Sequence, residues 1–278
     1  MATVNGNGTS GQINTSMPSA SHPRVHNVGG FQITTQKLPI LKAGPIDDMT
    51  TKIGITIPEM IFGDNFVAIQ HIPSRWGIKF DAYGALDRVD KTGEKRLKVA
   101  YSQDWHKSRE EAHDFKKLEE VKPFDWSYTP QDYRGEVAPE SPEFKESNVQ
   151  IPLELLKRPD PILFFDDVIL YEDELADNGI AMLSVKIRVM PARLLLLSRF
   201  FMRLDDVLVR VKDTRVYIDF EKKWVVREYL EKEKEYEAVR TELAGKRDDV
   251  SAALRDAGLM AEILPVVKTV IEEVTLPG

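Results

Sequence analysis

The arginines of the leucine-rich segment 192–204 constrain the fold more than any other feature of the chain. Leucine propensity alone favours a helix there. At a helical rotation of about 100° per residue, Arg193, Arg199 and Arg203 would point in widely different directions, whereas a strand places all three on one face. The segment is therefore predicted to be a strand.

Turn and strand signals on both sides extend this strand into an antiparallel meander, in which each strand pairs with the next. Asp213 and Arg215 are predicted to lie in a turn at the end of the meander. The other signals are a half-buried strand over 185–189, a two-residue turn at Asp205-Asp206, a returning strand over 207–211, a turn at 221–223 and a strand over 224–229.

The remaining patterns predict further strands and several helices, so the expected fold class is α+β, with layered antiparallel sheets flanked by helices. Alternating isoleucines predict a strand over 53–57, joined by a turn at 63–65 to a strand over 66–72. Further strands are expected at 76–80 and 97–101. Helices are expected at 102–120, 231–243, 249–259 and 263–274.

We expect a disordered tail over residues 1–28 and a single domain over 29–278. The tail is rich in Gly, Asn, Ser and Thr and has little apolar surface to bury. A long surface loop is predicted at about 129–161, where six prolines interrupt any periodicity. Ile151 and the leucines after it either dock this loop onto the core, which we favour, or contact a partner.

Composition limits the classes of function. The chain has 278 residues, a net charge of -7 and no cysteine, which excludes disulfides and thiolate chemistry. Its acidic balance argues against nucleic acid as the main partner. Its longest apolar run is too short to span a membrane. A cytoplasmic protein, with the nucleus as a second location, is the expectation.

Catalytic patterns are weak. A GxGxxG spacing at Gly6, Gly8 and Gly11 lies in the tail without a strand before it or a helix after it, so no nucleotide cofactor is expected. The acids at positions 166, 167, 172–174 and 177 could hold a metal ion, which leaves a carboxylate-metal hydrolase as an alternative. A solvated turn is the favoured interpretation of these acids.

Five strings of sequence, in order, carry a resemblance to a known family. They are PEMIFGDN at 58–65, VKPFDWSY at 121–128, YEDEL at 171–175, LSVKIRVMP at 183–191 and KDTR at 212–215. Together they resemble the TOR signalling pathway regulator-like family, also called TIPRL, over roughly residues 50–230.

The resemblance implies a fold of layered antiparallel sheets and a protein without catalytic activity. It also implies a role in TOR-linked signalling, with the catalytic subunit of type-2A-like serine/threonine phosphatases as the partner. The C-terminal tail of that subunit would lie in a cleft, and its activity would be modulated. The alpha-four/Tap-type phosphatase-associated protein is a further candidate partner.

Candidate partner-binding residues combine charged or aromatic chemistry with turn or edge positions. An acidic rim beside Arg215 would take a partner's peptide and its carboxylate. The candidates are Asp64, Asn65, Trp126, Glu172, Asp173, Glu174, Asp213 and Arg215, together with Val211 and Ile151. A passive scaffold, using the helix after Glu231 and the proline-rich loop, is the alternative.

We predict that the purified protein carries no tightly bound metal, because the sequence contains no complete set of ligands at metal-binding spacing. Elemental analysis checks this, and one equivalent of zinc, manganese or iron would contradict it.

Overall fold

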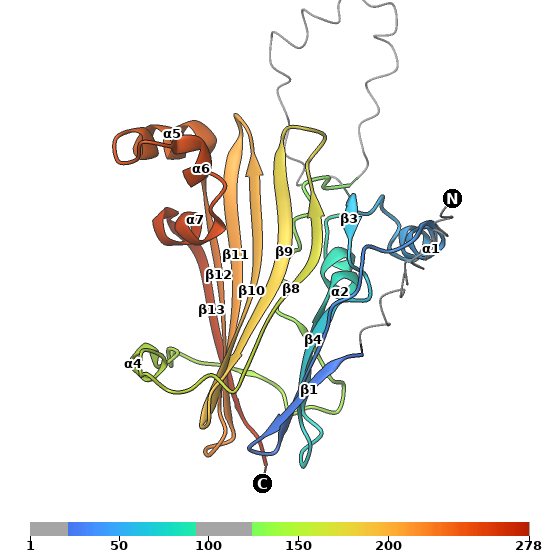
Figure 1. The fold of residues 1–278 in the computed structure, drawn as a ribbon, viewed down its shortest axis with the longest axis vertical. Helices are drawn as coiled ribbons and strands as arrows, with labels where there is room; N and C mark the ends of the chain where they lie inside the picture. The colour runs from blue at the N-terminus through green and yellow to red at the C-terminus, as the bar shows by residue number, and fades with distance from the viewer. Residues whose placement is uncertain (1–21, 93–123, 278) are drawn as a thin grey trace, which may run out of the picture.

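The computed structural model describes residues 22–92 and 124–277, which form two antiparallel β-sheets flanked by helices. Figure 1 shows the two sheets facing each other, with a group of helices at one end of the larger sheet. The α+β class with layered antiparallel sheets is thus confirmed.

The larger sheet contains the predicted meander at its centre. Strands β8 to β12 follow one another both along the chain and across the sheet. In spatial order the strands are β3 (Met60–Ile61), β8 (Phe164–Asp173), β9 (Gly179–Val189), β10 (Arg193–Leu204), β11 (Leu208–Asp219), β12 (Trp224–Glu235), β13 (Val266–Thr275) and β7 (Lys145–Glu146).

The smaller sheet is built mainly from the N-terminal part of the chain. Its strands are β1 (Arg24–Val28), β2 (Phe31–Gln36), β4 (Phe66–His71), β5 (Gly77–Asp81) and β6 (Glu136–Val137). The helices are α1 (Ala43–Ile53), α2 (Ala82–Asp87), α4 (Leu153–Leu156), α5 (Tyr236–Ala244), α6 (Val250–Ala253) and α7 (Ala257–Ile263).

The main core lies between the inner faces of the two sheets. Phe31 and Ile33 of β2 pack in the same cluster as Leu196 of β10 and Val216 of β11, and each is at most 1 % exposed. Removing this apolar surface from water is the main force that holds the layers together.

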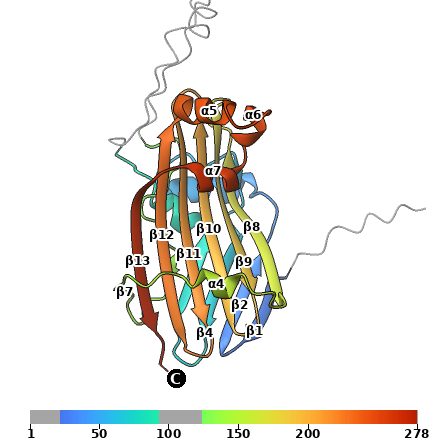
Figure 2. The same cartoon turned by 90° about the vertical axis from the view of Figure 1, so that its left-hand side faces the viewer.

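Two smaller clusters cover the outer face of the larger sheet (Figure 2). At one end, α5, α6 and α7 pack over Phe201 and Val211. At the other end, Ile151, which precedes α4, packs on Tyr217 and Val226. The favoured docking of the proline-rich loop through Ile151 is therefore confirmed.

The meander follows the predicted strands, but the predicted turn at Asp205-Asp206 is wrong in length. Leu204 pairs with Leu208, so three residues form the turn. Asp206 takes the left-handed conformation with φ 61°, which Asp tolerates better than most residues. The turn therefore needs one left-handed residue, not the two of a type I′ turn.

The predicted strand over 53–57 is wrong. Residues up to Ile53 belong to α1, which ends at Gly54 with φ 80° and a hydrogen bond from its N–H to Thr50 O at 2.8 Å. Ile53, Ile55 and Ile57 are all buried, so the alternation reflects packing at a helix end. The turn at 63–65 exists, but β3 and β4 on either side of it belong to different sheets.

The helix predicted over 231–243 begins later than expected, and the helix predicted over 263–274 is mostly a strand. The charged run after Glu231 continues β12 to Glu235, and only residues from Tyr236 form a helix. Residues 266–275 form β13, not a helix. Charges in these strands find partners across the sheet, such as Arg210 Nε to Glu233 Oε2 at 2.8 Å, so the charge pattern did not require a solvated helix.

The disordered tail predicted over residues 1–28 extends too far along the chain, because residues 24–28 form β1. The strand expected at 97–101 and the helix expected at 102–120 lie outside the described residues. Within the described ranges, no helix is both long enough and apolar enough to cross a membrane.

We predict that deleting residues 1–21 leaves the melting temperature unchanged, whereas deleting residues 1–28 lowers it by about 5 °C or more. β1 carries Arg24, which pairs with Asp166 at 3.0 Å, and His26, which stacks on Phe164. Calorimetry of the two truncated chains checks this. Equal melting temperatures would contradict a stabilising role for β1.

Candidate functional site

Residues 129–136, called the crossing segment below, run between the two sheets and hold them together. Tyr133 anchors the segment to the smaller sheet, because its hydroxyl donates to Asp81 O at 3.1 Å and accepts from Asp81 N–H at 3.0 Å. On the other side, Thr214 Oγ1 of β11 donates to Tyr133 O at 3.1 Å. The segment is therefore fixed to both layers by buried hydrogen bonds.

Gly135 allows the segment to lie close against the smaller sheet. Its φ of 82° is in the left-handed region, and a Cβ there would lie 2.7 Å from Phe80 Cζ. Only glycine fits both conditions without strain. The close approach sets the position of the neighbouring Arg134.

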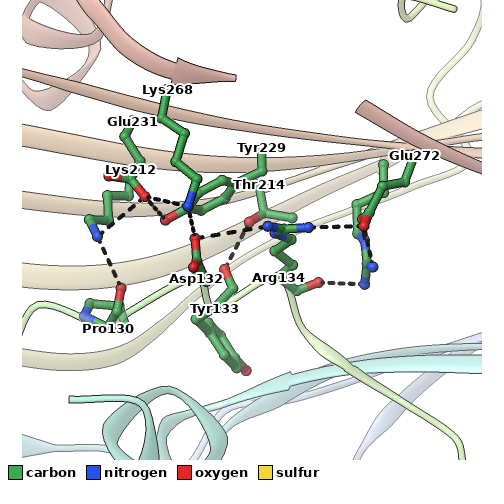
Figure 3. Close-up of polar contacts among 11 residues, drawn as sticks. Pro130, Asp132, Tyr133, Arg134, Lys212, Thr214, Tyr229, Glu231, Lys268 and Glu272 are labelled. Atoms are coloured by element: carbon green, nitrogen blue, oxygen red, sulfur yellow. Dashed lines mark hydrogen bonds and ion pairs between the residues drawn. The ribbon is translucent and has the colours of Figure 1, made fainter. Parts of the chain in front are cut away.

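Lysines and acids meet on one side of the crossing segment (Figure 3). Lys268 of β13 pairs with Asp132 and lies 3.7 Å from Glu231 Oε1. Lys212 Nζ is also 3.7 Å from Glu231 Oε1, and the Tyr229 hydroxyl donates to the same oxygen at 2.9 Å. Two cations therefore share Glu231.

Arginines dominate the other side of the segment. Arg134 Nη1 contacts Glu272 Oε1 at 2.9 Å (Figure 3). Arg227 Nη2 contacts Glu272 Oε2 at 2.7 Å, so the two arginines share one carboxylate. Aromatic rings support them: Arg134 lies 5.2 Å from the Tyr229 ring centre, and Arg227 lies 4.0 Å from that of Phe144. Stacking of this kind orients guanidinium groups.

A pocket of about 300 Å³ opens beside these arginines. Arg88, at the end of α2, lines this pocket together with Glu136, and its charge acts to lower the pKa of that carboxyl. Arg134 Nε is buried and has no hydrogen-bond partner among the described residues. The lining residues are Arg88, Asp132, Tyr133, Arg134, Gly135, Glu136 and Arg227.

In this region the acidic partners do not fully offset the cost of burying the cations. Burial lowers the pKa of Lys212 and of Arg227, because desolvation disfavours the charged form more than Glu231 and Glu272 favour it. The pKa of Asp132 is lowered, chiefly by its hydrogen bond from Lys268. An added anion in the pocket would therefore be stabilised by donors that are already in place.

The structure places Asp213 and Arg215 in the middle of β11 on the outer face, so their predicted turn is wrong. Asp213 is 1 % exposed and accepts two hydrogen bonds of 2.7 Å from Arg199, whose Nη1 also donates to Ala257 O of α7. Arg215 pairs with Glu228 at 3.1 Å and, more distantly, with Asp213 Oδ2 at 3.8 Å. This cluster attaches α7 to the sheet.

Several other candidates are structural. Val211 is buried beneath the helices and Ile151 beneath its loop, so neither presents a free surface. Asn65 is 3 % exposed; it accepts from Leu38 N–H and donates to Ile169 O. Trp126 is half-buried against the main core. Asp64 is exposed and lines a second, smaller pocket of about 200 Å³.

The acids at the end of β8 do not form a single rim. Asp173 is buried and accepts hydrogen bonds from the N–H groups of Glu59 and Leu175. Burial raises the pKa of the half-buried Glu172, and Glu174 is exposed. β9 and β10 separate this region from Arg215, so the predicted acidic rim beside Arg215 is wrong.

The acidic cluster proposed as a metal site is also dispersed. Asp166 is buried and Asp167 is exposed, as expected for opposite faces of a strand. Across residues 22–92 and 124–277, no group of three or more histidines and acids is arranged to hold a metal ion.

Sequence reasoning missed the pocket residues, although one signal was present. On β11 and β12 the inner positions change from apolar, at Val216 and Val225, to charged, at Lys212 and Glu231. A run of charges on the core-facing parity of a strand indicates either a buried network or a site.

Comparison with known proteins places the chain in a family. The profile of the TIP41-like family matches residues 60–240. The chain belongs to the TIP41-like family. It is 40% identical over 268 residues to the type 2A phosphatase activator TIP41 of Saccharomyces cerevisiae, with 91% of this chain and 74% of that protein covered. It is 38% identical over 252 residues to a human TIP41-like protein, with 90% and 88% covered.

The TIP41-like match includes the crossing segment, β11 and β12, but not β13. Lys268 and Glu272 thus lie outside the matched residues. The rest of the pocket lies inside them.

We predict that Asp213→Ala destabilises the protein by about 3–5 kcal/mol, because it leaves the largely buried Arg199 without its carboxylate. Arg215→Ala should cost about 1 kcal/mol or less, because Arg215 is 32% exposed. Urea unfolding of both variants checks this. Equal midpoints would show that the Arg199–Asp213 pair does not hold the sheet and α7 together.

Proposed function

We propose that this chain is a non-enzymatic regulator of type-2A protein phosphatases that binds their catalytic subunit. In this proposal the pocket beside the crossing segment receives the C-terminal tail of that subunit, with its terminal carboxylate among the arginines. The binding modulates phosphatase activity within TOR-linked signalling, in the cytoplasm and nucleus.

The names of relatives support the partner. The Saccharomyces cerevisiae and Schizosaccharomyces pombe relatives are both named as type 2A phosphatase activators, at 40% and 33% identity to this chain. Each name describes the relative. We extend this role to the present chain because the match covers 91% of it for the first relative and 85% for the second.

The observation that carries the mode of binding is the convergence of three arginines, Arg88, Arg134 and Arg227, on the lining of one pocket. Arg134 and Arg227 share one carboxylate, and Arg134 Nε has no acceptor among the described residues. Guanidinium groups bind carboxylates through paired, charge-assisted hydrogen bonds. A carboxylate at the end of a flexible peptide matches this arrangement.

The alternative of a passive scaffold has less support. It relied on a charged, solvated helix after Glu231, but residues up to Glu235 continue β12, and the helix that follows, α5, packs on the sheet through Val239 and Leu243. It also relied on the proline-rich loop, whose Ile151 is docked on the protein's own sheet.

We predict that Arg88→Ala and Arg134→Gln each weaken binding of a purified type-2A catalytic subunit by about thirtyfold, the loss expected for a central interfacial arginine. Calorimetric titration measures this. Arg75→Ala is the matched control: its side chain is 81% exposed and lies outside the pocket, so its affinity should stay within about threefold of wild type.

A catalytic subunit that lacks its C-terminal tail should also bind the wild-type protein about thirtyfold more weakly. Combining this tail deletion with Arg88→Ala should weaken binding no further. If wild type binds tightly but both pocket variants bind equally well, the pocket is not the tail site. If wild type does not bind the subunit at all, the proposed function is wrong.

A further inference from the structure

Within residues 22–92 and 124–277, no strand pairs with the outer edge of β8 from Phe165 to Ile169. β3 pairs only with Tyr171 and Glu172 near the end of β8, and β9 occupies the other side. In Figure 2, β8 lies at the margin of the larger sheet. Edge strands of this kind are ready templates for another strand.

Side chains take the place of the missing strand. Arg24 Nη1 donates to Phe165 O at 3.2 Å, Lys37 Nζ to Asp167 O at 3.3 Å and Asn65 Nδ2 to Ile169 O at 2.9 Å. The outward N–H of Asp167 donates to the side chain of the preceding residue at 3.1 Å. The contacts recur every second residue, as the hydrogen bonds of an added strand would.

Two of these contacts come from side chains that can leave. Arg24 and Lys37 are 55% and 49% exposed, and each also reaches the carboxylate of Asp166. Because both are long and half in solvent, they can turn away and pair with a ligand instead. These side chains therefore hinder non-specific strand pairing at the edge but can be displaced by a suitable ligand.

Apolar side chains accompany this edge. Phe165 and Ile169 are 51% and 36% exposed, and they point to the same outer face of β8. Ile162 and Leu163, just before the strand, are 55% and 46% exposed. A strand laid along the edge would cover this apolar surface with alternate side chains.

Charge indicates what kind of strand fits. Around Asp166 and Asp167 lie Arg24, Lys37 and Lys186, so three cations face two carboxylates. An acidic segment is thus favoured. A second copy of the chain is disfavoured, because antiparallel self-pairing centred on Asp167 would place this carboxylate opposite itself.

We propose that the edge of β8 from Phe165 to Asp167 is a second docking surface, which takes an extended, acidic and aliphatic segment of a partner protein as an added strand. The segment's backbone replaces the contacts of Arg24 and Lys37, and its carboxylates pair with these two side chains, whereas the buried Asn65 keeps its bond to Ile169 O and marks the end of the surface. This surface is separate from the pocket, so the proposal does not depend on the proposed function.

The test uses the full chain and an eight-residue peptide of alternating valine and glutamate. Amide hydrogen exchange, read residue by residue by NMR, should slow at least tenfold at Phe165 and Asp167 when the peptide saturates the protein. A peptide of alternating valine and lysine is the control and should give no protection. Added salt should weaken binding of the acidic peptide.

Two variants make the result specific. Asp167→Pro removes an outward N–H without touching the ladder to β9, so the fold should survive while peptide binding is lost. Phe165→Ser should weaken binding at least fivefold. Val25→Ser is the matched control, because Val25 is 52% exposed on β1 and not on this edge, and it should bind as wild type.

Failure of the acidic peptide to protect the outward amides would overturn the proposal. Equal protection by both peptides would overturn its charge selectivity, and a peptide-independent dimer in light scattering would identify a second copy as the occupant. Unchanged binding by a folded Asp167→Pro variant would rule out strand addition.

Discussion

The long strands of the larger sheet need cover on their inner face, and the smaller sheet is too short to supply all of it. β11 and β12 have 12 residues each, whereas β2 and β4 have 6 each. Val216 and Val225 lie in the apolar core shared with the smaller sheet. Farther along the same strands, the crossing segment provides the cover and the inner positions become charged. The pocket thus lies where apolar cover ends.

Local periodicity predicted the part of the fold that local pairing builds. In β9 and β10 the two-residue alternation and the shared face of the three arginines identified the strands correctly, against the helix propensity of leucine. The same reasoning failed at residues 231–235, because charges that pair across a sheet have the composition of a solvated helix. It failed again at residues 53–57, where buried isoleucines at the end of a helix occupy every second position, which is the pattern typical of a strand.

The pocket could not be predicted because its residues converge from distant segments. Arg134 and Glu272 are 138 residues apart in sequence, and no spacing rule relates them. Asp213 and Arg215 were predicted to bind because their chemistry is conspicuous, yet Asp213 is buried against Arg199. An isolated pair of charges on a strand does not reveal which face it occupies. The resemblance to a family suggested the class of partner, whereas the geometry supplied the surface that we propose for it.

Some contacts of the fold join residues that are close in sequence and others join distant residues, which implies an order of folding. Strands β8 to β12 are joined by short turns, so their pairing is local and is expected to form early in folding. The bond between Tyr133 and Thr214 joins residues 81 apart, and the smaller sheet docks through similarly distant contacts. The crossing segment therefore closes late and should be among the first parts to open in native-state fluctuations. Such local opening would widen the pocket and admit a peptide while the meander stays folded.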